Sequence, residues 1–207
     1  MLELLTGTGL AAAAGLNAYI PLLALGLAAR FTDLVQLPSG WSWLSNEWVL
    51  VILGVLLLIE LVADKIPAVD SINDWIQTIV RPASGGLVFG SGAASTTVAV
   101  TDPGNFFASN QWVSIAIGVA IALVVHLAKM LVRPALNALS AGLAAPVVST
   151  FEDVGSLVMT VFAIIIPVLV IVSIVGLAVA VWLIIRRARK TRRNQKSAVL
   201  PEGGTAG

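Results

Sequence analysis

Six long apolar stretches constrain the possible folds of this chain more than any other feature of its sequence. A membrane-spanning helix needs about 20 predominantly apolar residues. Because 58% of the 207 residues are hydrophobic and only 11% are charged, the chain cannot cover itself with polar surface. We therefore expect an all-α polytopic membrane protein, and we exclude a soluble enzyme and a nucleic-acid-binding protein. The expected transmembrane helices number about six and cover about residues 5–29, 48–63, 83–101, 112–131, 135–150 and 155–185.

The charges are distributed unevenly along the chain. Residues 186–207 hold seven Lys and Arg residues against one acid, whereas residues 1–185 hold five against ten acids. A basic run directly after an apolar stretch marks the cytoplasmic side of a membrane protein. We therefore predict a transmembrane domain over 1–185 and a basic, disordered cytoplasmic tail over 186–207. Both termini are expected on the cytoplasmic side of a bacterial inner membrane.

The six stretches fall into two classes of composition. The first, third and fifth are rich in Gly, Ala, Ser and Thr, and Gly86 and Gly90 form a GxxxG spacing. The second, fourth and sixth carry larger aliphatic residues. Because small residues let helices approach closely in lipid, we expect the first class to form an inner bundle and the second to surround it.

A short motif occurs twice in the chain. Val80-Arg81-Pro82-Ala83 recurs 52 residues later as Val132-Arg133-Pro134-Ala135. Proline is favoured at the first position of a helix, so each copy is predicted to open a helix that crosses the membrane outward. This arrangement would be a parallel structural repeat, and chance similarity in an apolar chain is the alternative.

Two local patterns predict helix positions outside the spans. Asp70, Asp74, Gln77 and Arg81 form a polar stripe, which predicts a short amphipathic helix over residues 69–80 on the inner membrane surface. The segment Ser149-Thr150-Phe151-Glu152 matches a capping box and predicts that the sixth helix opens there.

Ionisable residues gather at the predicted inner ends of the helices. Such groups are costly near a membrane and are commonly functional, which favours an ion- or solute-binding vestibule. The alternative is a set of structural ion pairs, with Asp74 and Arg81 as one example. The candidate binding residues of this cluster are Glu60, Asp64, Asp70, Asp74, Arg81, His126, Lys129 and Arg133.

Asn17 and Tyr19 form a second candidate site in the middle of the first stretch. Pro21 cannot donate to the carbonyl of Asn17, which would leave that carbonyl free. Transporters build sites at interrupted helices near the membrane midplane, whereas a simple packing kink is the alternative. The chain has no cysteine and one histidine, so a metal site would depend on carboxylates beside His126. No catalytic motif and no cofactor motif is present.

Three segments resemble a known family. They are residues 15–26, residues 63–74 with the Ala-Asp-Lys-Ile-Pro sequence, and residues 79–83. Together they are similar to the bacterial membrane proteins grouped as domain of unknown function 4126, over about residues 10–160. The resemblance implies membrane placement and adds no mechanism.

Two functional classes follow from these observations. The first is a small transporter or channel for an ion or a small solute. The second is a non-transporting membrane scaffold or accessory subunit that packs with a second copy or with a membrane partner protein. In either class the lipid bilayer is a partner.

Overall fold

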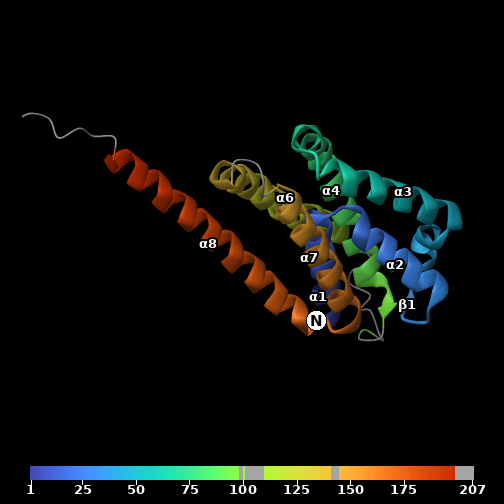
Figure 1. Cartoon of the computed structure of the whole chain (residues 1–207). Coiled ribbons are helices and arrows are strands. Elements are labelled where there is room, and N and C mark those ends of the chain that lie inside the picture. Colours follow the sequence, from blue (N-terminus) through green and yellow to red (C-terminus); the bar gives the residue numbers. More distant parts are fainter. Residues whose placement is uncertain (98–99, 101–109, 141–144, 199–207) are drawn as a thin grey trace, which may run out of the picture.

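The computed structural model is built almost entirely of helices (Figure 1), which confirms the all-α class. It describes all residues except 98–99, 101–109, 141–144 and 199–207. Two short strands pair antiparallel, with Val35 opposite Thr97. The elements are α1 (Leu2–Leu16), α2 (Tyr19–Phe31), β1 (Val35–Gln36), the 3-10 helix η1 (Ser39–Ser45), α3 (Glu47–Ala63), α4 (Pro67–Ala94), β2 (Thr96–Thr97), α6 (Gln111–Ser140), α7 (Ala145–Ile165) and α8 (Val168–Ala198).

Three segments of the described helices are long and apolar enough to cross a membrane: Gln111–Arg133, Pro146–Ile165 and Val168–Arg187. A fourth would be η1 together with α3, although the pair is bent by 57°. The helices α1 and α2 are apolar but shorter. The structure is therefore compatible with a membrane protein, and the expected number of six transmembrane helices is not confirmed.

The first predicted span is two helices rather than one. Helix α1 ends at Leu16, and Asn17 has an extended backbone with φ −142° and ψ 123°. Helix α2 begins at Tyr19, which places Pro21 in its first turn. A proline there sacrifices no hydrogen bond, because the first N–H groups of a helix have no partner within it. The expected kink is therefore a complete break.

Two other prolines lie inside helices, contrary to the prediction that they begin them. Helix α4 runs through Pro82 and joins the expected surface helix to the third span. Helix α6 continues through Pro134 to Ser140. Residues 135–150 therefore do not form a separate fifth helix, since the first six belong to α6 and the last six to α7. Residues 141–144 of that prediction lie outside the described residues.

The sixth predicted span is also wrong in its boundaries. It is interrupted at Ile166 and Pro167, between α7 and α8. The residue before a proline is disfavoured in the helical region, which explains the break at Ile166. The expected capping box lies inside α7 and does not open a helix. Helix α8 continues through the basic run to Ala198, so residues 186–198 are helical rather than disordered.

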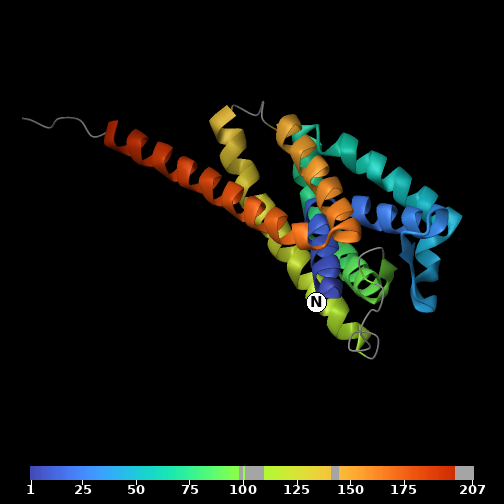
Figure 2. The same ribbon diagram turned by 90° about the horizontal axis from the view of Figure 1, so that it is seen from below.

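Helix α1 runs through the middle of the bundle, enclosed by α4, α6 and α7 (Figure 2). Its Ala11, Ala13 and Ala14 are completely buried. Helices α4 and α6 approach closely through glycines, since a Cβ at Gly86 would lie 2.9 Å from Val119 Cγ2. The inner bundle thus contains the small-residue parts of α1 and α4, as expected, together with α6, which was expected outside.

The contacts between α4 and α6 show that these two helices are antiparallel. Thr78 contacts His126, whereas Gly86, further along α4, lies against Ile115 near the start of α6. The helix segments after Arg81 and after Arg133 therefore run in opposite directions, and the predicted parallel repeat is wrong.

Helices α3 and α8 lie at the periphery, as expected for the second and sixth stretches. The outer face of α3 exposes apolar side chains such as Val51, Val55 and Leu58. Helix α8 extends away from the other helices in both views (Figures 1 and 2). Exposed aliphatic surface of this kind suits contact with lipid.

Candidate functional site

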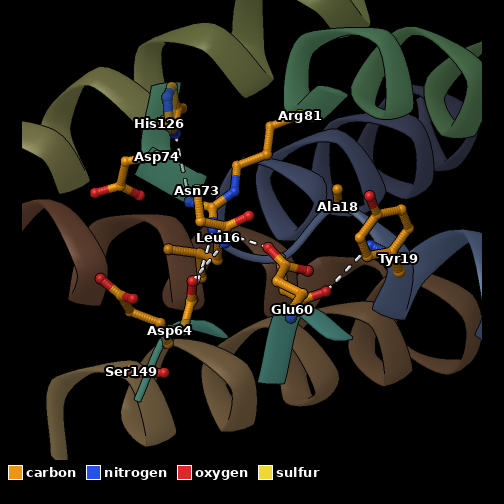
Figure 3. A network of polar contacts seen from close by, with 12 residues as sticks. Leu16, Ala18, Tyr19, Glu60, Asp64, Asn73, Asp74, Arg81, His126 and Ser149 are labelled. Carbon is orange, nitrogen blue, oxygen red and sulfur yellow. Dashed lines mark hydrogen bonds and ion pairs between the residues drawn. The ribbon is translucent and has the colours of Figure 1, made fainter. Parts of the chain in front are cut away.

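Nine charged side chains gather beside the break between α1 and α2, and we call this group the charge network. They come from the end of α3 and the residues after it, and from α4, α6 and α7. Figure 3 shows four of them, Glu60, Asp64, Asp74 and Arg81. Every member forms an ion pair with another member. The members are Glu60, Asp64, Lys65, Asp74, Arg81, Lys129, Arg133, Glu152 and Asp153.

Asp64 is the centre of the charge network. Its Oδ2 lies 3.3 Å from Arg133 Nη2, 3.6 Å from Lys129 Nζ and 3.8 Å from Arg81 Nη2. Asn73 donates a hydrogen bond of 2.8 Å to its Oδ1. Burial by itself would raise the pKa of Asp64, but the three positive charges outweigh burial and hold that pKa below its ordinary value.

Glu152 of α7 is the closest partner of two cations. Its Oε2 lies 2.7 Å from Arg133 Nη2 and 2.9 Å from Lys129 Nζ. Arg133 also reaches Asp74 at 3.8 Å. Since Lys129 and Arg133 are one helical turn apart, a single face of α6 presents both cations to Asp64 at the end of α3 and to the carboxylates of α4 and α7.

Arg81 occupies a completely buried position on α4. Its Nη2 donates to Glu60 Oε1 at 2.9 Å, and its Nη1 lies 3.4 Å from His126 Nδ1. A guanidinium can only donate, so Nδ1 accepts and the imidazole is neutral with its proton on Nε2. That proton is directed to Thr78 Oγ1 at 3.1 Å. His126 therefore contributes no positive charge.

The helix break is bonded directly to the charge network. Asn17 Oδ1 accepts from the backbone N–H groups of Tyr19 and Ile20 at 3.1 and 3.2 Å, which caps α2. Asn17 Nδ2 donates to Asp153 Oδ1 at 3.0 Å. The carbonyl of Leu16, at the end of α1, accepts from Lys129 Nζ at 3.3 Å. The break thus positions groups of the network as well as ending a helix.

Three oxygen atoms in this region are buried without a hydrogen-bond partner among the described residues. They are Glu60 Oε2, Asp74 Oδ1 and Gln77 Oε1, and Glu60 and Gln77 are each 2% exposed. The Tyr19 side chain lies within interaction range of Glu60 and Gln77. Unpaired buried acceptors are uncommon in proteins and call for a physical explanation.

The structure brings nine of the ten predicted site residues to this region, and their role in binding stays a prediction. The side chain of the tenth, Asp70, lies outside the described residues. The suggested pairing of Asp74 with Arg81 is wrong, because Asp74 faces Arg133 and Arg81 faces Glu60. The nine are Asn17, Tyr19, Glu60, Asp64, Asp74, Arg81, His126, Lys129 and Arg133.

Sequence reasoning did not select Lys65, Glu152 and Asp153 as site residues. The two acids were assigned to the start of a helix because of a capping-box pattern. The signal that marks these acids is their adjacent position inside an otherwise apolar stretch. Within the described part of the chain, no group of three or more His, Cys, Asp or Glu residues is arranged to hold a metal ion.

These features define a small helical protein, compatible with a membrane, in which nine charged side chains form a largely buried network. A family model described as a domain of unknown function (DUF4126) matches residues 4–187, so the chain belongs to this family. The resemblance noted in the sequence is thereby confirmed. Searches of curated proteins and of solved structures found no match.

Proposed function

We propose that this protein is a small transporter or channel for an ion or a small solute, with the charge network as its binding site. We place it in the cytoplasmic membrane of a bacterium, with both termini cytoplasmic, and we propose no enzymatic activity. The observation that carries this proposal is that most of the charge network is buried beside the break between α1 and α2.

The energetics of buried charges support a functional role for the network. At least nine of the fifteen charged residues before Arg186 are in it. Replacing a buried ion pair by apolar residues of similar volume is often neutral or even stabilising, so stability alone does not account for so many charges. Ionisable groups inside membrane proteins commonly mark ion or solute pathways, and discontinuous helices commonly form their sites.

Reconstitution into liposomes tests the proposal. The wild type should move at least one member of a panel of ions and small solutes under an imposed pH gradient or membrane potential. Asp64→Asn should abolish that movement, because it removes the shared partner of three cations. Asp33→Asn is the matched control, since Asp33 is exposed between α2 and β1 and should leave movement unchanged.

Both variants are first shown to be folded by size-exclusion chromatography and thermal unfolding. If Asp64→Asn does not fold, Asp74→Asn replaces it, because among the described residues Asp74 forms one ion pair, with Arg133 at 3.8 Å, whereas Asp64 forms three. The absence of movement for every ion and solute, with folded wild-type protein, would contradict the proposal.

A second candidate function, a membrane scaffold or accessory subunit, is favoured by α8. This helix leaves the bundle and exposes Ile171, Val172 and Val175, which offers surface to a second copy or to a membrane partner protein. Cysteine cross-linking through Val172→Cys in native membranes tests this role, because the chain has no other cysteine. Specific cross-linked species without any solute movement would favour the scaffold.

A further inference from the structure

The described side chains of the charge network do not balance in charge. They comprise five carboxylates and four cations, and His126 is neutral through its contacts with Arg81 and Thr78. One negative charge is therefore in excess. An uncompensated charge is expensive in a buried site, and protonation of one carboxylate removes it at the lowest cost.

The ion pairs show which carboxylates are well compensated. Asp64 contacts three cations and Asn73, and Glu152 contacts two cations at less than 3 Å. Asp153 accepts from Asn17 and pairs with Lys65. Each of these three has two or more partners for its negative charge.

Glu60 and Asp74 are the least compensated carboxylates. Among the described residues each has one ion pair, Glu60 with Arg81 and Asp74 with Arg133, and each has one buried oxygen without a hydrogen-bond partner. Glu60 shares Arg81 with Asp64 and its side chain is only 1% exposed, whereas the side chain of Asp74 is 13% exposed. Glu60 is therefore the more deeply buried of the two, and burial disfavours the charged form of a carboxylate. The other charged or titratable groups near Glu60 are Lys129 on α6 and Tyr19 on α2.

The unpaired oxygen of Glu60 marks where a proton would be held. Glu60 Oε2 is a buried acceptor without a hydrogen-bond partner among the described residues. The Tyr19 side chain lies within interaction range of Glu60 and of Gln77, so polar groups are close to this carboxyl. A proton on Oε2 converts this atom into a donor.

We infer that Glu60 Oε2 binds an exchangeable proton, which makes this carboxyl the proton-coupling group of the transporter. The inference rests on the proposed function for its role in transport. The proton comes from water on one side of the membrane and returns to water. Its release leaves the network with one excess negative charge, which favours entry of a cation or renewed protonation.

Infrared difference spectroscopy of the reconstituted protein tests this assignment. A pH step should reveal the C=O stretch of a protonated carboxylic acid, and this band should shift in D₂O because the proton exchanges. Glu60→Gln should remove the band. Glu47→Gln is the matched control, because Glu47 lies on the same helix, is exposed and pairs only with Arg30 among the described residues, so the band should remain.

A second variant tests the assignment without removing the carboxyl. Glu60→Asp keeps a carboxyl that can be protonated but shortens the side chain by one methylene, so the C=O band should change in frequency while remaining present. This readout does not depend on whether Glu60→Gln folds. A spectrum without the band, a band that persists in folded Glu60→Gln, a band removed by Asp74→Asn instead, or an unshifted band in Glu60→Asp would each overturn the inference.

The spectroscopic experiment tests the proton site and the transport experiment tests the transporter, so each hypothesis can be refuted without the other. A band assigned to Glu60 with no movement of any solute would support the proton site and contradict the transporter. Movement of a solute that is unaffected by an opposing pH gradient, with no protonated carboxyl band, would support the transporter and overturn the proton site.

Discussion

The contact between α4 and α6 at Gly118 leads to a sharp prediction about stability. A Cβ at this position would overlap the backbone carbonyl oxygen of Gly85 and lie 2.5 Å from Phe89 Cβ. Because the Gly85 atom belongs to the backbone, rotation of a side chain cannot relieve the overlap. The two helices must separate, and overpacking of this kind costs about 1–3 kcal/mol.

Gly54 of α3 provides the matched control for Gly118→Ala. A Cβ at Gly54 would meet no atom within 4 Å, and Gly54 also lies inside a helix. Both substitutions gain the same helix propensity, about 0.5–1 kcal/mol, so the difference between them isolates the packing cost. Gly54→Ala should be neutral or slightly stabilising.

Thermal unfolding in detergent, followed by circular dichroism, measures the difference. One kcal/mol shifts Tm by about 2–4 °C for a chain of this size, so Gly118→Ala should melt about 2–12 °C below Gly54→Ala. Gly176→Ala on α8 is a second control that should behave like Gly54→Ala, because its Cβ would also meet no atom. Equal Tm values for Gly118→Ala and the two controls would refute the close approach of α4 and α6.

Three further predictions concern the site and the topology. Glu152→Gln should lower the free energy of unfolding by about 3–5 kcal/mol, because two buried cations lose their closest carboxylate. Glu47→Gln, at an exposed position, should lower it by at most about 1 kcal/mol, and equal losses in chemical or thermal unfolding would contradict the prediction. Asn17→Ala should cost about 1–2 kcal/mol through loss of the α2 cap, and an unchanged Tm would show that the cap does not stabilise the break. In intact cells an impermeant thiol reagent should label Ser39→Cys and not Ser197→Cys, and the opposite pattern would reverse the predicted orientation.

The helical class and several elements were predictable from local sequence. The second stretch was predicted over 48–63 and forms Glu47–Ala63. Most of the network was also predictable, because charged residues in an apolar chain are few and sit at the ends of the apolar runs. These features depend on composition and on short-range spacing, which are read directly from the order of residues.

Proline shows why the helix boundaries were not predictable. Pro21 lies in the first turn of a helix, Pro82 and Pro134 lie inside helices, and Pro167 separates two helices. An interior proline costs about 3 kcal/mol, and only contacts with other helices can offset that cost. In α4, the glycines that follow Pro82 pack closely against α6.

The sequence by itself determined that this chain is helical and apolar and that its charges are concentrated in a few places. Only the tertiary structure decided which charges pair. Asp74 faces Arg133 of another helix rather than Arg81 of its own, and Glu152 enters the network from α7. The reason is that a Coulomb interaction depends on distance in space and on burial, and both are set by how the helices pack.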